Sequence, residues 1–225
     1  MVYIAVSIKV KSPEQALASI KEAVSQKPDL LELRLDYMPN LDEKALDTVL
    51  DCCSLPAIAT IRNKDEAGPD KEAGFKGTEE ERAAYLRQAV ERGAAYVDIE
   101  AVKYGEIKGY GFDKKDAKLI LSYHDFEKTP GHLINMCAAF KYNLPEADII
   151  KFAVKTNSEE DCEAVMRLLE QVDNIPLIAI GMGELGIKTR VHPKNYLTYI
   201  CLSKEEASAP GQYNIEEARE ELAKQ

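Results

Sequence analysis

Residues 147–154 read Ala-Asp-Ile-Ile-Lys-Phe-Ala-Val, a short and almost continuous apolar run. Runs of this kind, rich in β-branched and aromatic residues, are typical of strands buried on both faces, as the strands of parallel sheets are. Lys151 stands in the middle of the run. Because a charged amine that leaves water without a partner costs several kcal/mol, such a lysine is usually paired, neutral or used covalently. The run therefore predicts a parallel α/β fold and singles out Lys151.

Similar apolar runs recur along the chain and predict eight strands in all. They cover residues 2–8, 29–35, 56–61, 95–101, 118–123, 148–154, 176–180 and 196–202. Segments with helical spacing lie between most of them, for example 13–25, 42–53, 79–92 and 158–171. Thr78 followed three residues later by Glu81 predicts a capping box at the start of one helix.

Eight strand–helix units in 225 residues predict a (β/α)8 TIM barrel that forms a single domain over residues 1–225. Residues 103–116, rich in Gly and Lys, leave little room for a helix, so the fourth helix is expected to be short or missing. An open doubly wound sheet is the alternative. The first strand is followed by Lys-Val-Lys-Ser rather than by a Gly-rich phosphate loop, which speaks against a dinucleotide-binding sheet.

Composition narrows the classes of partner. The formal net charge of −10 argues against nucleic acid and anionic membranes, since both are bound by basic faces. The five cysteines follow neither zinc-site nor disulfide-framework spacing, so we expect reduced thiols. The sequence shows no apolar stretch long enough to span a membrane and no basic leader before residue 2. We therefore expect a soluble, cytoplasmic protein.

Polar residues collect where the predicted strands end. The carboxyl ends of barrel strands converge on one mouth, where such enzymes place their chemistry. The residues in question are Ser7, Glu32, Arg34, Asp36, Arg62, Asp98, Glu100, His124, Lys151, Arg190, Ser208 and Gln212. The last two flank a short segment, Ser208-Ala209-Pro210-Gly211-Gln212, that we interpret as a mobile flap. Their coincidence at one end of the barrel predicts a binding site there.

Each of these residues also has a purely structural interpretation. Glu32, Arg34 and Asp36 alternate along one strand, as the members of an internal salt-bridge ladder do. Asp98 and Glu100 would suit a solvated rim, or would pair with Lys151 across the barrel. A lone histidine such as His124 is more often structural than catalytic.

An amine attacks a carbonyl only when it is unprotonated. At an ordinary pKa of about 10.4, about one lysine in 2500 is neutral at pH 7, whereas burial and cationic neighbours lower such a pKa by several units. Arg34, Arg62 and Arg190 would supply the positive charge, and would also bind a small anionic ligand. His124 would remove a proton beside the resulting iminium. This combination predicts a cofactor-free Schiff-base lyase acting on an anionic keto compound.

The chain also resembles the type I 3-dehydroquinate dehydratases. The resemblance runs in order through nearly the whole chain. It is carried by Glu-Leu-Arg-Leu-Asp at 32–36, Thr-Ile-Arg at 60–62 with Glu66, Val-Asp-Ile-Glu at 97–100, Ser-Tyr-His-Asp-Phe at 122–126, Ile-Lys-Phe-Ala at 150–153, Gly-Met-Gly at 181–183 with Arg190, and Ser-Ala-Pro-Gly-Gln at 208–212. The Ser-Tyr-His-Asp-Phe and Ser-Ala-Pro-Gly-Gln motifs are the most specific.

The resemblance implies a TIM barrel, usually a homodimer, that converts 3-dehydroquinate to 3-dehydroshikimate in the shikimate pathway of aromatic amino acid biosynthesis. It implies no cofactor and no metal. Lys151 would form the imine with the C3 ketone, His124 would act as general acid and base, and Glu66 would orient His124. Arg190, Ser208 and Gln212 would hold the substrate carboxylate. The ring and hydroxyls would be contacted by Ser7, Glu32, Arg34 and Arg62.

One position departs from the family pattern. Thr189 precedes the late arginine, where the family carries a serine, and this puts the detailed carboxylate geometry in question. Two other hypotheses stay open on the residues alone, and a third is disfavoured. A Schiff-base aldolase would use the same lysine with a base placed for carbon–carbon cleavage. A catalytically silent barrel would only bind an anionic metabolite, and a metal-dependent hydrolase would need clustered histidines, which the dispersed His124, His132 and His192 do not supply.

Overall fold

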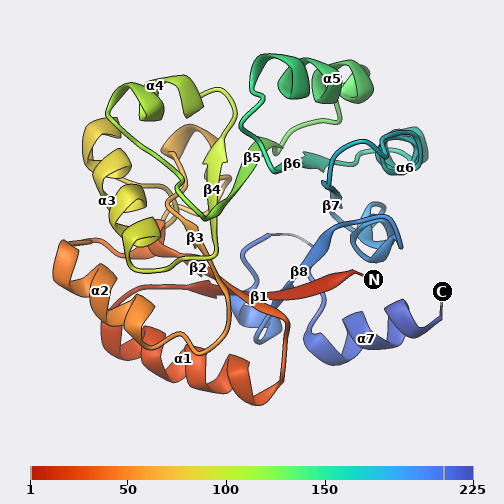
Figure 1. Ribbon diagram of the computed structural model, residues 1–225. Coiled ribbons are helices and arrows are strands. Elements are labelled where there is room, and N and C mark those ends of the chain that lie inside the picture. The colour runs from red at the N-terminus through yellow and green to blue at the C-terminus, as the bar shows by residue number, and fades with distance from the viewer. Residues whose placement is uncertain (1, 210, 225) are drawn as a thin grey trace.

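The computed structural model describes residues 2–209 and 211–224, which form a barrel of parallel strands surrounded by helices (Figure 1). The strands are β1 Tyr3–Lys9, β2 Leu30–Arg34, β3 Ala57–Thr60, β4 Tyr96–Glu100, β5 Lys118–Asp125, β6 Ile149–Lys155, β7 Leu177–Met182 and β8 Leu197–Cys201. Each predicted strand is therefore confirmed, with ends that differ by up to two residues. The sheet order runs from β7 down to β1 and then to β8, so the first strand of the chain pairs with the last.

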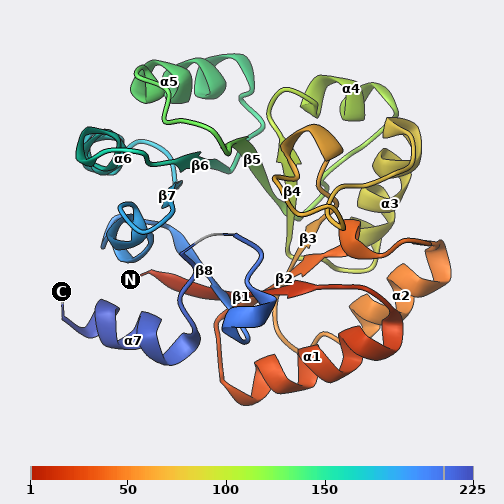
Figure 2. The same cartoon turned by 180° about the vertical axis from the view of Figure 1, so that it is seen from behind.

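The helices cover the outside of the barrel, as Figures 1 and 2 show from opposite sides. They are α1 Pro13–Ser25, α2 Glu43–Asp51, α3 Glu79–Glu91, α4 Tyr104–Gly109, α5 Leu133–Asn143, α6 Glu159–Gln171 and α7 Ile215–Ala223. Side-chain caps define where several of them begin. The predicted capping box of Thr78 and Glu81 is present at the start of α3. The fourth helix is short, as the sequence predicts, because only six residues are helical there.

One crossover departs from the regular pattern that the sequence suggests. Within the described residues, β7 is followed by a 3-10 turn, η3 Ile187–Val191, in the place of a seventh barrel helix. Asn195 then bridges β7 to the segment before β8. Its amide oxygen accepts from the backbone N–H of Ala179 at 2.8 Å, and its amide nitrogen donates to the carbonyls of Ala179 and Thr189. This side chain takes over hydrogen bonds that a strand partner would otherwise supply.

Alternation along the strands separates two environments. On β6, Ile150, Phe152 and Val154 point outward and pack in the core beneath α5 and α6. Ile149 and Ala153 point into the barrel, on the same face as Lys151. The residues directly before and after Lys151 in the sequence therefore belong to the outer core, whereas Lys151 itself faces the barrel interior.

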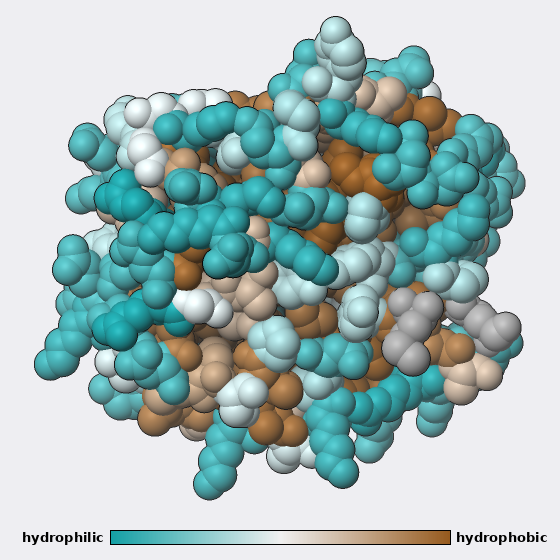
Figure 3. All heavy atoms as spheres, viewed as in Figure 1, coloured by the Kyte–Doolittle hydropathy of each residue, from teal (hydrophilic) through white to brown (hydrophobic). Residues whose placement is uncertain are grey.

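The barrel interior is apolar at its amino end and polar at its carboxyl end. The apolar half is filled by Ala5, Leu30, Ile58, Ile120, Ile149, Ile178 and Leu197. The polar half contains buried Ser7, Glu32, Thr60, Asp98, Glu100, Ser122 and Lys151. The exterior face in Figure 3 is largely hydrophilic, with apolar side chains gathered mainly in recesses. Among the described helices, none has both the length and the apolar character that a bilayer crossing requires.

Candidate active site

A small cavity of about 50 Å³ opens at the carboxyl end of the barrel. It is lined by Glu32, Arg34, Arg62, Glu66, Ala67, His124, Phe126, Lys151, Ala153, Ile180, Met182, Arg190, Tyr199, Ser208, Ala209 and Gln212. Of the residues to which the sequence assigned a catalytic or substrate-binding role, all are in this set except Ser7, whereas Asp36, Asp98 and Glu100 do not line the cavity. The Ser7 hydroxyl lies directly beneath it, 2.5 Å from Glu32 Oε2 and 3.0 Å from Ser208 Oγ. Pro210 of the flap segment lies outside the described residues.

Lys151 lies at the floor of this cavity and is only 5% exposed. Its Nζ donates to Asp98 Oδ2 at 2.8 Å and lies 4.0 Å from Glu32 Oε1. It also lies 4.1 Å from the centroid of the Tyr199 ring, within cation–π range. The pairing with Asp98 that the sequence left as an alternative is therefore present.

Asp98 is the centre of a buried charge network. Arg62 Nη2 donates to Asp98 Oδ1 at 2.8 Å, while Arg62 Nη1 donates to Glu100 Oε1 and to Ser122 Oγ, both at 2.8 Å. Burial by itself would raise the pKa of Asp98, but Arg62 and Lys151 hold that pKa far below its ordinary value. Asp98 is therefore an ionised carboxylate that two cations share. Neither Asp98 nor Glu100 lies on a solvated rim, since both are fully buried.

His124 faces the same cavity from β5 and is oriented by Glu66. Glu66 Oε2 lies 3.0 Å from His124 Nδ1 and accepts from the His124 backbone N–H at 2.8 Å. Burial lowers the pKa of His124 well below its ordinary value, and the charges of Arg62 and Lys151 act in the same direction. The ring is therefore neutral near pH 7. With Nδ1 protonated and donating to Glu66, Nε2 keeps its lone pair and is able to accept a proton.

Phe126 supports the ring of His124 from one side. The two rings are stacked, with centroids 6.2 Å apart and planes inclined by 13°. Gly68 lies against the Phe126 ring, with a φ of +82°. A Cβ at Gly68 would lie 2.6 Å from Cε1 of Phe126, so only glycine allows the loop after Glu66 to pack this closely.

Arginines and the flap form the rest of the cavity wall. Arg34 is held by Asp36 through two hydrogen bonds of 2.9 Å, which makes that pair the internal salt bridge that the sequence offered as an alternative. Arg190, from η3, is 1% exposed, and burial lowers its pKa to about 10, so it stays cationic at neutral pH. In the flap, the backbone N–H of Ser208 donates to Gln212 Oε1 at 2.7 Å.

The expectation that three arginines repel the charge on Lys151 needs revision. Arg34 and Arg62 are each paired with buried carboxylates, which offset their charges locally. The groups that lie near Nζ are instead the acidic Asp98 and Glu32 and the ring of Tyr199. The environment of Lys151 is therefore set by a balance of opposite charges rather than by an excess of positive ones.

Sequence reasoning missed Tyr199 and Phe126, which both line the cavity. Tyr199 lies in an apolar strand, where it is indistinguishable from an ordinary core aromatic. Its hydroxyl is buried and, within residues 2–209 and 211–224, has no hydrogen-bond partner. Burial raises the pKa of this hydroxyl well above its ordinary value, so it is a neutral donor and acceptor available to a bound molecule.

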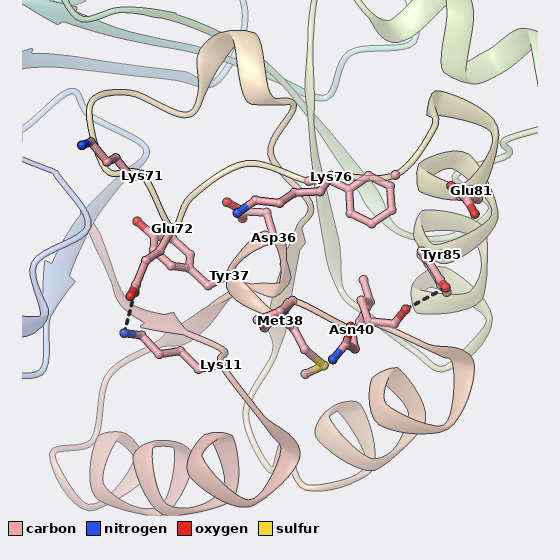
Figure 4. Close-up of a pocket in the computed structure, with 14 residues that line it drawn as sticks. Lys11, Asp36, Tyr37, Met38, Asn40, Lys71, Glu72, Lys76, Glu81 and Tyr85 are labelled. Atoms are coloured by element: carbon pink, nitrogen blue, oxygen red, sulfur yellow. Dashed lines mark hydrogen bonds and ion pairs between the residues drawn. The ribbon is translucent and has the colours of Figure 1, made fainter.

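A larger cavity of about 410 Å³ lies outside the barrel, between the loops after β1, β2 and β3 (Figure 4). Of the polar residues that the sequence placed at the strand ends, Asp36 is the one found among the described residues that line it. Its polar groups are engaged with one another, for example Lys11 with Glu72 at 2.6 Å and the Tyr85 hydroxyl with the Leu41 carbonyl at 2.8 Å. The smaller cavity, with its amine, imidazole and arginines, has the chemistry that the larger one lacks.

Comparison with known proteins points to one family. The family model described as type I 3-dehydroquinase matches residues 4–224. A 3-dehydroquinate dehydratase of Methanococcus vannielii is 35% identical over 217 residues, covering 93% of each chain. One of Desulfotalea psychrophila is 36% identical over 199 residues, covering 85% of this chain and 84% of the relative. The crystal structure of 3-dehydroquinate dehydratase from Geobacillus kaustophilus aligns with a TM-score of 0.87 at 25% identity, covering 99% of this chain and 90% of that one.

Proposed function

The chain belongs to the type I 3-dehydroquinase family of hydro-lyases, and from this premise we propose that it dehydrates 3-dehydroquinate to 3-dehydroshikimate through an imine on Lys151. The observation that carries the proposal is the placement of Lys151 and His124 on the wall of one small buried cavity, with Arg190 beside them. The proposal also includes three further expectations: a role in the shikimate pathway, a cytoplasmic location and a homodimer.

The first step joins the substrate to the protein. The unprotonated Nζ of Lys151 attacks the C3 ketone, and the carbinolamine loses water to form an iminium. Asp98, 2.8 Å from Nζ, accepts a hydrogen bond from the amine and then faces the positive iminium. Its ionised state is favourable here because it offsets the charge that the iminium carries.

The elimination follows on the adjacent carbons. His124 Nε2 removes a proton from C2, and the electron pair moves into the iminium to give an enamine. The enamine then expels the C1 hydroxyl, which receives the proton from His124 and leaves as water. Hydrolysis of the conjugated imine releases the ketone product and returns Lys151 to its amine form. Glu66 holds Nδ1, so that Nε2 carries out both proton transfers.

The substrate carboxylate is best accommodated by Arg190 and the flap. Arg190 is a buried cation that lines the same cavity as Lys151. Ser208 and Gln212 line the same cavity and are hydrogen-bonded to each other. The Ser7 hydroxyl donates to Glu32 and lies within hydrogen-bond distance of the Ser208 hydroxyl. A closed flap of this kind excludes water from the iminium. The Tyr199 hydroxyl offers a further partner for a substrate oxygen or for the departing water.

Reductive trapping tests the proposal directly. We expect sodium borohydride added together with 3-dehydroquinate to reduce the imine and leave a stable mass increment on the peptide that contains Lys151. Borohydride alone, without substrate, is the control and should leave the peptide unchanged. An increment on another residue, or an active enzyme that shows none, would reject the proposed chemistry.

Glu66 predicts how activity depends on pH. Burial raises the pKa of Glu66 to about 7. Below that pH Glu66 is protonated and donates to His124 Nδ1, which moves the ring proton to Nε2 and removes the base. We therefore expect kcat/KM to fall about tenfold per pH unit below pH 7. In the pH profile of Glu66→Gln this acid limb should disappear, whereas the exposed Glu72→Gln should keep it; an unchanged limb in Glu66→Gln would contradict the assignment.

A further inference from the structure

Arg82 is a fully buried charge that lies outside the cavity. It extends from α3 toward the carboxyl end of β4 and has 0% exposure. Its Nη1 donates to Glu100 Oε2 at 2.7 Å and to the carbonyl of Ile61 at 2.9 Å. Its Nε and Nη2 donate to Glu79 Oε2, at 3.0 and 2.6 Å, near the start of the same helix. Charged side chains are almost never fully buried unless they are paired, so this position requires a reason.

A continuous series of hydrogen-bonded charges connects Arg82 to the candidate nucleophile. Glu100 receives Arg82 on one oxygen and Arg62 on the other, at 2.7 and 2.8 Å. Arg62 in turn donates to Asp98 at 2.8 Å, and Asp98 receives Lys151 at 2.8 Å. Every residue in the series is at most 5% exposed, so solvent screens these interactions little.

The charges in this hydrogen-bonded series, which does not include Glu32 at 4.0 Å from Nζ, balance when Lys151 is neutral. Arg62 and Arg82 carry two positive charges, and Asp98 and Glu100 carry two negative ones. If Arg82 were absent, loss of the proton from Lys151 would leave a net negative charge buried in the barrel, which is unfavourable. Glu79, the other partner of Arg82, is 15% exposed at its side chain and lies nearer to solvent.

We propose that Arg82 is a positioning residue for the proposed imine chemistry. It neutralises Glu100, so that Arg62 is shared with Asp98, and Lys151 then loses its proton at a lower pH. The inference rests on the proposed function, because it concerns the same lysine. Lys151 is also faced by Glu32 from β2, by His124 from β5 and by the Tyr199 ring from β8, with Arg34 beyond them. These groups are unchanged by a substitution on α3.

The test follows the proton on Lys151 without using the substrate. Competitive labelling with a trace of acetic anhydride, over a range of pH, reports the free amine of Lys151 by mass spectrometry of its peptide. We expect the labelling midpoint of Arg82→Gln to lie about one pH unit above that of the unsubstituted protein. Glu100→Gln should move it about as far in the opposite direction, and the double variant should return it close to the starting value.

A purely structural role for Arg82 would lower thermal stability but leave these midpoints unchanged. Arg82→Lys should largely restore the midpoint, because it keeps the charge. Arg92→Gln removes an exposed arginine paired with Asp47 at the other end of α3, and is the matched control expected to show no shift. A folded Arg82→Gln with the original midpoint would overturn the inference. If that variant does not fold, a double variant with the same midpoint as Glu100→Gln would overturn it.

The enzyme assay separates this inference from the proposed function. In the unsubstituted protein, borohydride trapping with 3-dehydroquinate tests the function alone. If trapping succeeds, kcat/KM of Arg82→Gln should be reduced at neutral pH and approach that of the unsubstituted enzyme as the pH rises. If trapping fails while the labelling midpoints shift as expected, the function is wrong and the coupling between Arg82 and Lys151 stands.

Discussion

Replacement of Lys151 by alanine is expected to lower kcat for 3-dehydroquinate by about 10⁴-fold or more, within the range produced by loss of a covalent nucleophile. The reason is that no iminium can form, so the proton on C2 loses the electron sink that makes it acidic. Formation of the conjugated ketone product, followed by its ultraviolet absorbance, measures the effect. The borohydride-dependent mass increment should disappear in the same variant.

The variant has to be separated from a folding defect. Lys151 is one of two cations bound to Asp98, and removing one partner of a buried pair typically costs about 3–5 kcal/mol. Lys151→Arg is therefore the informative companion, because a guanidinium keeps the positive charge near Asp98 and forms no imine. Lys118→Ala, an exposed lysine at the amino end of β5, is the control that should retain full activity. Substantial turnover by a folded Lys151→Arg would remove the lysine from the mechanism.

Replacement of His124 by alanine is expected to lower kcat by about 10²-fold or more, the contribution typical of a general acid and base. Imine formation requires only the amine and the ketone, so borohydride should still trap substrate on Lys151. Measurement of both properties on one preparation distinguishes loss of proton transfer from loss of binding. The loss of His124 also leaves Glu66 and Phe126 in place on the cavity wall.

The control for this prediction is His132→Ala. His132 precedes α5 and is exposed, so its removal should leave kcat unchanged. Turnover by His124→Ala within a few-fold of the unsubstituted enzyme would contradict its role as the base. Loss of the trapped adduct together with turnover would instead indicate that His124 takes the proton from Lys151 before the amine attacks.

Several parts of the site were predictable because strand geometry makes them so. In a parallel barrel, residues at alternate positions near the carboxyl ends of strands face one opening, whatever the sequence between them. Ser7, Glu32, Arg62, His124 and Lys151 therefore converge once their strands are recognised. The carboxylate that orients His124 is different. Glu66 lies in the 3-10 turn η2, Lys64–Glu66, and only the family resemblance pointed to it.

Other parts had no local signal. Arg82 lies in a helix whose pattern marks it as one polar residue among many, yet it is completely buried because the end of β4 presents Glu100 to it. Asp36 continues the alternation of Glu32 and Arg34, but the strand ends at Arg34 and Asp36 turns away to hold that arginine. The missing helix after β7 was likewise not foreseen, since nothing in the pattern of residues 183–196 shows that the Asn195 side chain bonds to the backbone of Ala179 and Thr189.

The sequence by itself determined the eight strands, their parallel order and the end of the barrel at which chemistry is placed, because hydrophobic periodicity and strand alternation are local properties of the chain. The tertiary structure decided which charges meet. Asp98, rather than three repelling arginines, is the nearest charged partner of Lys151, and Arg62, Glu100 and Arg82 set the charge around that pair. The physical reason is that buried electrostatic interactions depend on distances of a few ångströms between residues on different elements, and those distances exist only after the barrel has closed.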